Sequence, residues 1–102
     1  MAQFKVYRNE RRSQAEVPFL VDVQSDLVQT GSRLVVPLVR ADRYGLRYSR
    51  LSPTFTIDGL GVVAAVSDLA AIDERMLRAE VADLSTERYV LLGAIDFLTT
   101  GH

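Results

Sequence analysis

The chain has 102 residues, 48% of them hydrophobic, and its 12 Lys or Arg against 13 Asp or Glu leave a formal net charge of -1. This length suffices for one compact core, so we expect residues 1–102 to form a single domain. The balanced charge gives no global reason to expect nucleic acid or an anionic membrane as a partner.

The residue types also limit the chemistry. The sequence has no cysteine and one histidine, His102, so it predicts no disulfide, no metal site and no cofactor, and it argues against an enzyme. No apolar run approaches the roughly 20 residues that span a bilayer, and we therefore expect a cytoplasmic protein without a membrane partner.

The N-terminal part predicts strands. Residues 3–7 alternate apolar and polar side chains, and 19–23 form a second candidate strand beyond a polar loop at 9–16. Turn-forming residues at 30–32 precede a branched run at 34–36, which predicts a third strand. Because Pro37 has no backbone N–H, we expect this strand to lie at a sheet edge or to end there.

The middle of the chain predicts a connection followed by a hairpin. Residues 39–52 have no clean period, and we expect a long surface connection with about one helical turn at most. Asp58-Gly59 lies between two strand-like runs, 54–57 and 60–66, and this pair tolerates the positive φ angles of a tight turn.

The C-terminal part predicts a helix, preceded by an ambiguous segment. In residues 69–84 the apolar side chains begin at helical spacing but later suit either state, and propensity alone favours a helix. Ser85 is a favourable N-cap, Gly101 suits a stop, and a stripe spaced i, i+3, i+4, i+7 lies between them: Leu91, Ala94, Ile95 and Leu98. The pattern therefore predicts a small, mainly β, mostly antiparallel domain with one C-terminal helix.

Three short motifs lie along the chain in order: QFKVY at 3–7, VDVQSD at 21–26 and EVADLS at 80–85. With VVPL at 35–38 between them, they resemble the CcdB toxin family across the whole chain. The resemblance implies an SH3-like barrel, shared with the MazF and Kid toxins, with a small antiparallel extension and a C-terminal α-helix. It also implies that much of 69–84 is extended or irregular, and we adopt this against the local helical spacing.

The resemblance also implies a function. Members of the family are homodimers that bind the A subunit of DNA gyrase, trap its cleaved-DNA complex without bond chemistry of their own, and are neutralised by a CcdA-like antitoxin. No direct contact with nucleic acid is implied. The gyrase-binding residues carried over by position are Gln3, Phe4, Ser25, Leu27, Val28, Asp96, Thr100, Gly101 and His102. The antitoxin-binding residues are Arg11, Ile57 and Val62.

Some of these positions depart from the family pattern. The tail Thr100-Gly101-His102 has no tryptophan, so it cannot make the cation–π contact with a gyrase arginine that the family's tail implies. Asp96 adds a charge near the tail, and Val62 replaces another tryptophan, which suggests a different cognate antitoxin.

Other interpretations of the same residues stay open. Strand periodicity places Phe4 in the core, and Asp22, Asp26 and Asp58 suit turns better than catalysis or metal binding. Several arginines form either a solvated surface or a docking face for an acidic antitoxin tail: Arg8, Arg11, Arg12, Arg40, Arg43, Arg47 and Arg50. A non-toxic relative and a MazF-like endoribonuclease using Arg33 or Arg40 are the alternative functions.

Overall fold

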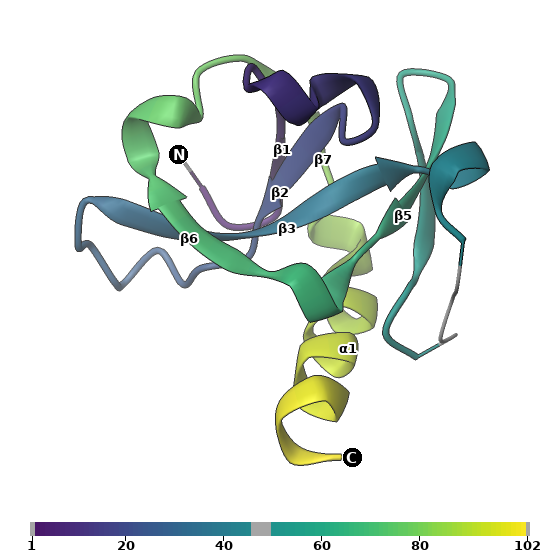
Figure 1. Cartoon of the computed structure of the whole chain (residues 1–102). Coiled ribbons are helices and arrows are strands. Elements are labelled where there is room, and N and C mark those ends of the chain that lie inside the picture. The colour runs from purple at the N-terminus through teal and green to yellow at the C-terminus, as the bar shows by residue number, and fades with distance from the viewer. Residues whose placement is uncertain (1, 46–49, 102) are drawn as a thin grey trace.

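The structure is a computed structural model that describes residues 2–45 and 50–101, and within these residues the chain is mainly β (Figure 1). The strands form a curled antiparallel sheet of order β4-β5-β3-β2-β1-β7, and β6 also pairs with β3. Their bounds are β1 Lys5–Arg8, β2 Phe19–Asp22, β3 Ser32–Arg40, β4 Thr54–Ile57, β5 Leu60–Ala64, β6 Ala70–Asp73 and β7 Glu80–Asp83.

One α-helix and several single 3₁₀ turns complete the described fold. The helix α1 spans Arg88–Thr100 and packs against the sheet near η3 and η5 (Figure 1). The 3₁₀ turns are η1 Arg12–Ala15, η2 Ala41–Arg43, η3 Val66–Asp68, η4 Glu74–Met76 and η5 Ser85–Glu87. The helical turn expected within 39–52 is η2, although β3 extends further into this segment than predicted, and residues 46–49 lie outside the described part.

The first strand begins later than predicted because of the backbone at Phe4. Phe4 has φ 70, in the left-handed region that a strand cannot contain, and the Lys5 amide donates to the Ala2 carbonyl at 3.1 Å. The chain therefore turns at residues 3 and 4, and β1 starts at Lys5.

The long strand β3 organises the sheet. One edge pairs with β2, while the other pairs first with β6, at Ser32–Val35, and then with β5, at Leu38–Arg40. Pro37 lies where this partner changes, and its carbonyl accepts from the Ala65 amide at 2.9 Å. Since N and C=O of a strand residue face the same side, the missing N–H faces the break between β6 and β5. The prediction that Pro37 marks an edge or the end of the strand is wrong.

The hairpin prediction is confirmed. Asp58 and Gly59 have φ 54 and 76, and they join β4 to β5 in antiparallel register. The second strand ends at Ala64, two residues before the expected Val66, because η3 begins there.

The segment 69–84 is not helical, as the family resemblance implied. It contains β6, η4 and β7, and the strands pair with β3 and β1, respectively. Pairing with distant strands therefore overrides the helical spacing of the local sequence.

The helix is confirmed, but its predicted N-cap is wrong. The structure shows no side-chain capping bond at this end, and Ser85 opens η5, where its amide donates to Asp83 Oδ1 at 2.8 Å. Gly101 ends α1 with φ 78, and its amide donates to the Phe97 carbonyl at 3.0 Å.

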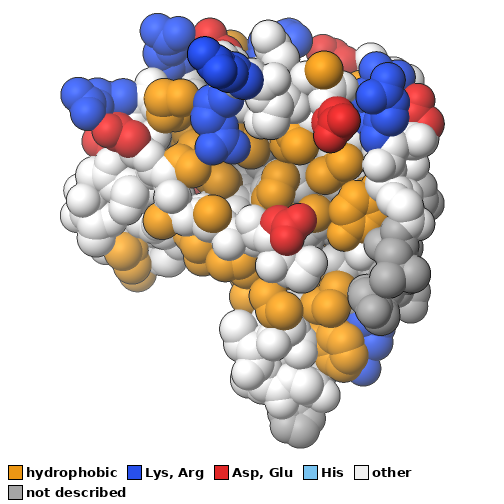
Figure 2. Space-filling model, viewed as in Figure 1, with side chains coloured by type: hydrophobic (Ala, Val, Ile, Leu, Met, Phe, Trp, Pro, Cys, Tyr) orange, Lys and Arg blue, Asp and Glu red, His pale blue; other side chains and the backbone are white. Residues whose placement is uncertain are grey.

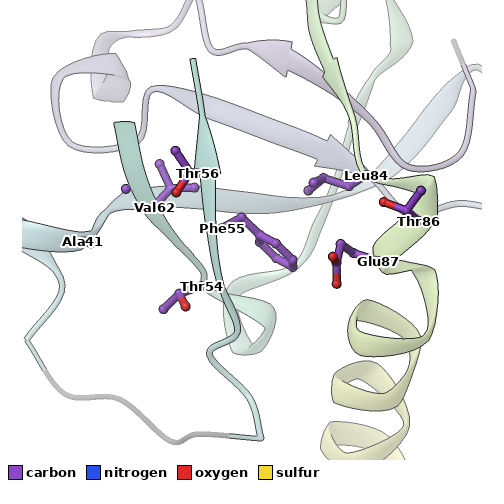
Figure 3. Close-up of a pocket in the computed structure, with 9 residues that line it drawn as sticks. Ala41, Thr54, Phe55, Thr56, Val62, Leu84, Thr86 and Glu87 are labelled. Carbon is purple, nitrogen blue, oxygen red and sulfur yellow. The ribbon is translucent and has the colours of Figure 1, made fainter. Parts of the chain in front are cut away.

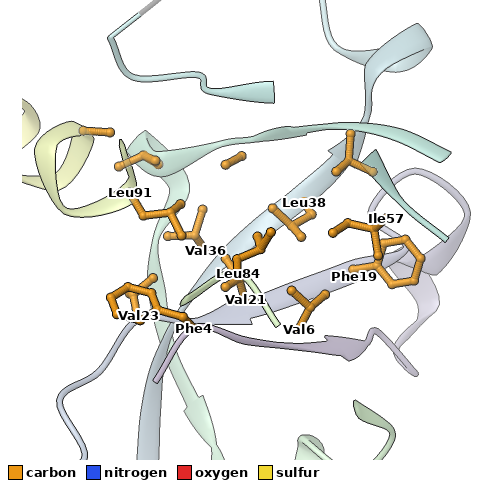
Figure 4. Close-up of a cluster of buried hydrophobic side chains, with 14 residues drawn as sticks. Phe4, Val6, Phe19, Val21, Val23, Val36, Leu38, Ile57, Leu84 and Leu91 are labelled. Atoms are coloured by element: carbon orange, nitrogen blue, oxygen red, sulfur yellow. The ribbon is translucent and has the colours of Figure 1, made fainter. Parts of the chain in front are cut away.

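Both faces of the sheet are covered. Strand neighbours point to opposite faces, so Val6, Val21 and Val36 enter the main core cluster beneath α1, while Tyr7, Leu20 and Val35 enter a second cluster. Figure 4 shows strand side chains and Leu91 of α1 directed into the same main cluster. The β2–β3 connection and the C-terminal end of α1 therefore extend from the sheet at two separate places (Figure 1).

Candidate functional site

The β2–β3 loop, residues 23–31, carries an apolar tip in solvent. Leu27 is 95% exposed and Val28 46% exposed. Ser25 shapes the turn, because its Oγ accepts from the Leu27 amide at 3.2 Å and its carbonyl accepts from the Val28 amide at 3.1 Å. Large apolar side chains held in water by a defined turn are typical of a protein-binding surface.

A buried ion pair supports this loop. Arg33 Nε lies 2.7 Å from Asp22 Oδ2, and the two side chains are 6% and 0% exposed. The other carboxylate oxygen, Asp22 Oδ1, accepts from the Gln24 amide at 3.0 Å. The hydrogen bond to Asp22 raises the pKa of Arg33, which therefore stays charged beneath the loop.

Arg33 also reaches the loop itself. Its Nη2 donates to the Gln24 carbonyl and to Asp26 Oδ1, each at 3.1 Å. Gln24 adds three bonds from its side chain, since Nε2 donates to the Val28 carbonyl at 2.9 Å and to the Ser32 carbonyl at 3.1 Å, and Oε1 accepts from the Leu34 amide at 2.8 Å. The loop is therefore tied to both strands that it connects.

The N-terminal segment joins the same surface. The Gln3 amide donates to Asp26 Oδ1 at 2.9 Å, and Gln3 Nε2 donates to the Val23 carbonyl at 3.1 Å. Four of the sequence-predicted gyrase-binding residues thus come together here: Gln3, Ser25, Leu27 and Val28.

Phe4 takes a different place. Its side chain is 2% exposed and belongs to the main core cluster, with the Arg88 guanidinium 5.4 Å from the ring centroid. Its backbone donates to the Asp22 carbonyl and accepts from the Leu84 amide at 2.8 Å. The structure therefore supports the core interpretation of the Phe4 ring.

The C-terminal candidates lie at a second location. Asp96, Thr100 and Gly101 are exposed at the end of α1, where Thr100 Oγ1 donates to the Asp96 carbonyl at 2.6 Å. Figure 1 shows this end of the helix projecting away from the sheet and from the β2–β3 loop. The two groups of candidates lie apart within one chain, and His102 lies outside the described residues.

The three antitoxin candidates do not form one exposed group. Arg11 is exposed, with its Nε 3.3 Å from Asn9 Oδ1, whereas Ile57 and Val62 are 2% and 0% exposed. Val62 nevertheless lines a pocket between the β4–β5 hairpin and the start of α1, where the Phe55 ring points toward Glu87 (Figure 3). Sequence analysis missed this pocket because its walls come from segments that are distant in the chain: Ala41, Thr54, Phe55, Thr56, Gly61, Val62, Leu84, Thr86 and Glu87.

Basic side chains gather at the end of the molecule that carries η1 and η4 (Figure 2). Several arginines already have acidic partners: Arg75 lies 2.7 Å from Asp73, and Arg78 lies 3.1 Å from Glu10. Hydrogen bonds from Arg75 lower the pKa of Asp73 to about 2. The carboxylates beside these arginines partly neutralise their positive charge, which weakens the attraction of this surface for an acidic partner.

Some of the arginines that the sequence predicted as a docking face also have partners within the chain. Arg40 Nη2 lies 3.1 Å from Asp42 Oδ2, and the Arg50 guanidinium lies 4.1 Å from the Phe97 ring centroid. Arg47 lies outside the described residues. Arg33 and Arg40, the two candidates for an endoribonuclease, are both engaged with carboxylates, and Arg33 is buried as well.

The described part of the chain shows neither a metal-binding cluster nor a membrane-spanning helix. It contains no group of three or more His, Cys, Asp or Glu side chains arranged to hold a metal ion. Its helix is too short to cross a membrane.

The family model described as "CcdB protein" matches residues 3–101 of the 102-residue chain. The chain belongs to the CcdB family. The curled antiparallel sheet with a C-terminal helix has the SH3-like fold expected of this family, and membership supports a toxin of a toxin–antitoxin module, in a family of non-enzymatic toxins. A search of curated proteins finds no match to the chain.

The ion-pair residues are the part of the site that the sequence did not reveal. Asp22 and Asp26 suit turns and Arg33 suits a basic groove when each is considered alone. One signal was present: Asp22 directly follows the apolar run Phe19-Leu20-Val21 and ends a strand whose four residues are all buried, and a buried carboxylate requires a charged partner.

Proposed function

We propose that the chain is a toxin that binds the A subunit of DNA gyrase and traps its complex with cleaved DNA, which blocks replication and transcription. The observation that carries the proposal is the 95% exposed Leu27 on a loop that a buried ion pair holds in place. Exposed apolar surface costs about 25 cal/mol per Å², and a partner that covers Leu27 and Val28 recovers that free energy. Membership of the CcdB family supports gyrase as the proposed target.

We further propose that a homodimer is the active form. The exposed apolar side chains of α1, Tyr89 at 82%, Val90 at 46% and Leu98 at 38%, offer surface for association. A two-fold dimer presents each β2–β3 loop and each helix end twice, which suits a target with two-fold symmetry. In such a dimer, the β2–β3 loop of one protomer and the C-terminal tail of its partner contact the same target.

A CcdA-like antitoxin is the proposed neutralising partner. Arg11 and its exposed neighbours Arg8 and Arg12 offer charge-assisted hydrogen bonds to acidic side chains, and a disordered antitoxin tail that orders on binding could reach the pocket beside Val62. Substituting Arg11 and Arg12 together should weaken antitoxin binding while gyrase binding persists, because these residues lie away from the β2–β3 loop.

Gyrase-dependent DNA cleavage tests the function. Purified protein, gyrase, supercoiled plasmid and ATP are expected to accumulate linear DNA after detergent and protease, while an RNA substrate stays intact. Reactions without gyrase are the control. Absence of linear DNA with gyrases from several species would support the non-toxic relative instead, and cleavage of the RNA would support the endoribonuclease.

Replacing Leu27 with aspartate should weaken gyrase binding roughly 30-fold or more, because a central apolar contact becomes a buried charge in the complex. The dissociation constant for the gyrase A subunit, measured by calorimetry, checks this result. Met76→Asp is the matched control, since Met76 is another exposed hydrophobic residue, 38% exposed and on η4. Equal binding by both variants would contradict a role for the loop.

Deletion of residues 100–102 should abolish DNA trapping and leave the fold nearly unchanged. Thr100 and Gly101 are exposed, and in the described part of the chain Thr100 Oγ1 donates to the Asp96 carbonyl and the Gly101 amide to the Phe97 carbonyl, both in the preceding turn of α1. Circular dichroism and thermal unfolding report the fold, and the plasmid assay reports trapping. Thr99→Ala is the control, because it removes a side-chain bond to the Ile95 carbonyl without shortening the chain. Full trapping by the truncated protein would refute a role for the tail.

A further inference from the structure

Asp26 joins segments that are distant in the sequence. A single carboxylate oxygen, Oδ1, accepts from the Gln3 amide at 2.9 Å and from Arg33 Nη2 at 3.1 Å. Gln3 precedes β1, Asp26 lies in the β2–β3 loop, and Arg33 lies in β3. The side chain is 59% exposed, so this junction lies at the surface and not in the core.

The Arg33 side of the junction is fixed independently of Asp26. Arg33 remains bonded to the buried Asp22 at 2.7 Å and to the Gln24 carbonyl at 3.1 Å. Loss of the Asp26 carboxylate therefore leaves the buried ion pair in place. The bonds that it removes are those that the Gln3 amide and Arg33 Nη2 make to the loop at Asp26.

The neighbours of Asp26 are the proposed gyrase contacts. The Asp26 side chain is held inward by Arg33 and Gln3, and the residues on either side, Ser25 and Leu27, are both exposed. Ser25 in turn bonds to the Leu27 amide. Anchoring Asp26 thus fixes the direction in which Leu27 leaves the surface and the distance between Leu27 and Gln3.

We infer that Asp26 is a positioning residue that holds Gln3 and the Ser25–Val28 tip together as one preformed binding surface. The gyrase part of this inference rests on the proposed function. A surface that is ordered before binding avoids the entropy cost of ordering its side chains in the complex, so the gain appears as affinity. Asp26 acts through Gln3 and Leu27, and the buried ion pair acts as its support.

The test compares Asp26→Ala, Asp26→Asn and Glu74→Gln. Asparagine keeps an oxygen acceptor for the Gln3 amide and Arg33, whereas alanine removes it. Glu74 lines the same open polar pocket as Asp26 and Arg33, so Glu74→Gln removes an equal charge at the same place and serves as the control. The three variants therefore separate the hydrogen-bond junction from local charge.

Two measurements are made on each full-length variant. Amide hydrogen exchange by NMR reports the Gln3 N–H, with the Val23 amide, which bonds to the Leu34 carbonyl at 2.9 Å, as the internal reference. Calorimetry reports affinity for the gyrase A subunit. Asp26→Ala should speed Gln3 exchange and weaken gyrase binding, each by about 10-fold, with Val23 unchanged. Asp26→Asn should recover much of both, and Glu74→Gln should match the wild type.

The outcomes separate the two proposals. Unchanged Gln3 exchange in Asp26→Ala would overturn the inference, as would faster exchange with undiminished gyrase affinity. Equal effects of Glu74→Gln and Asp26→Ala would also overturn it, since charge alone would then suffice. If the wild type does not bind gyrase, the proposed function fails, while Gln3 exchange still decides whether Asp26 holds the two segments together.

Discussion

Replacing Arg33 with alanine is expected to lower the free energy of unfolding by about 3–5 kcal/mol. Arg33 Nε lies 2.7 Å from Asp22 Oδ2 in a pair whose side chains are 6% and 0% exposed. Without the guanidinium, the Asp22 carboxylate stays buried with the Gln24 amide as its remaining hydrogen-bond donor among those described. Because the free energy of unfolding of a small domain is roughly 5–15 kcal/mol, this loss is a large fraction of the total stability. Urea unfolding of purified variants at one protein concentration measures it.

Arg75→Ala is the matched control for this prediction. The Arg75–Asp73 pair has the same 2.7 Å separation, but its side chains are 86% and 44% exposed. Solvent screens such a pair, and both partners are well hydrated when separated, so the unfolding midpoint should stay near that of the wild type. Similar losses in the two variants would contradict the argument that burial, and not distance, determines the contribution of the pair.

A double variant separates the charge from the packing. Asp22→Val with Arg33→Leu removes both buried charges and fills their place with apolar atoms, so it should be less destabilising than Arg33→Ala alone. The same double variant should lose the bonds from Arg33 to Gln24 and Asp26, which hold the β2–β3 loop. A stable protein with weakened gyrase binding would therefore separate the structural role of the pair from its support of the binding surface.

Local patterns predicted the strands and the hairpin because their information lies in neighbouring residues. Asp58-Gly59 has the backbone freedom that its turn requires, and the structure confirms φ 54 and 76 there. Pro37 was misassigned because its tolerance depends on a distant event, the change of β3 from β6 to β5. No pattern around residue 37 reports which strands pair with it.

Residues 69–84 are a second segment whose structure depends on pairing with distant strands and not on the local sequence. Their spacing alone favours a helix, but β6 and β7 are held by β3 and β1, which lie far away in the sequence. The family resemblance was informative here because it carries the outcome of those distant pairings. The capping prediction at Ser85 failed for a smaller reason, since the chain inserts the η5 turn before the helix begins.

In the candidate site, too, the sequence predicted what depends on single residues but not what depends on contacts between distant residues. The sequence could name Leu27 and Val28 but could not decide their exposure, and the structure places both in solvent. It gave two interpretations of Phe4, and the structure puts its ring in the core. The Asp22–Arg33 pair required knowing that β2 and β3 are neighbours, which the linear sequence does not state.

Replacing Leu91 with alanine is expected to destabilise the domain by about 2–5 kcal/mol, because the substitution removes buried methyl groups and leaves a cavity. Leu91 is 0% exposed, and Ala94 is the other residue of α1 that is buried. The helix is thus anchored to the main core cluster by few side chains, and a weakened anchor at Leu91 should also loosen the position of the tail. Urea unfolding gives the change in stability, and helix content by circular dichroism shows whether α1 separates before the sheet unfolds.

Val90→Ala is the control for Leu91, and it also tests the proposed dimer. Val90 precedes Leu91 in the same helix but is 46% exposed, so truncation should change the stability of the isolated chain little. If α1 contributes to a homodimer interface, the effect of Val90→Ala will grow with protein concentration, since association stabilises the folded state by mass action. The effect of Leu91→Ala should persist at every concentration, because its cavity lies within one chain. Equal losses for both variants at the lowest concentration would contradict the placement of Leu91 as the anchor of α1.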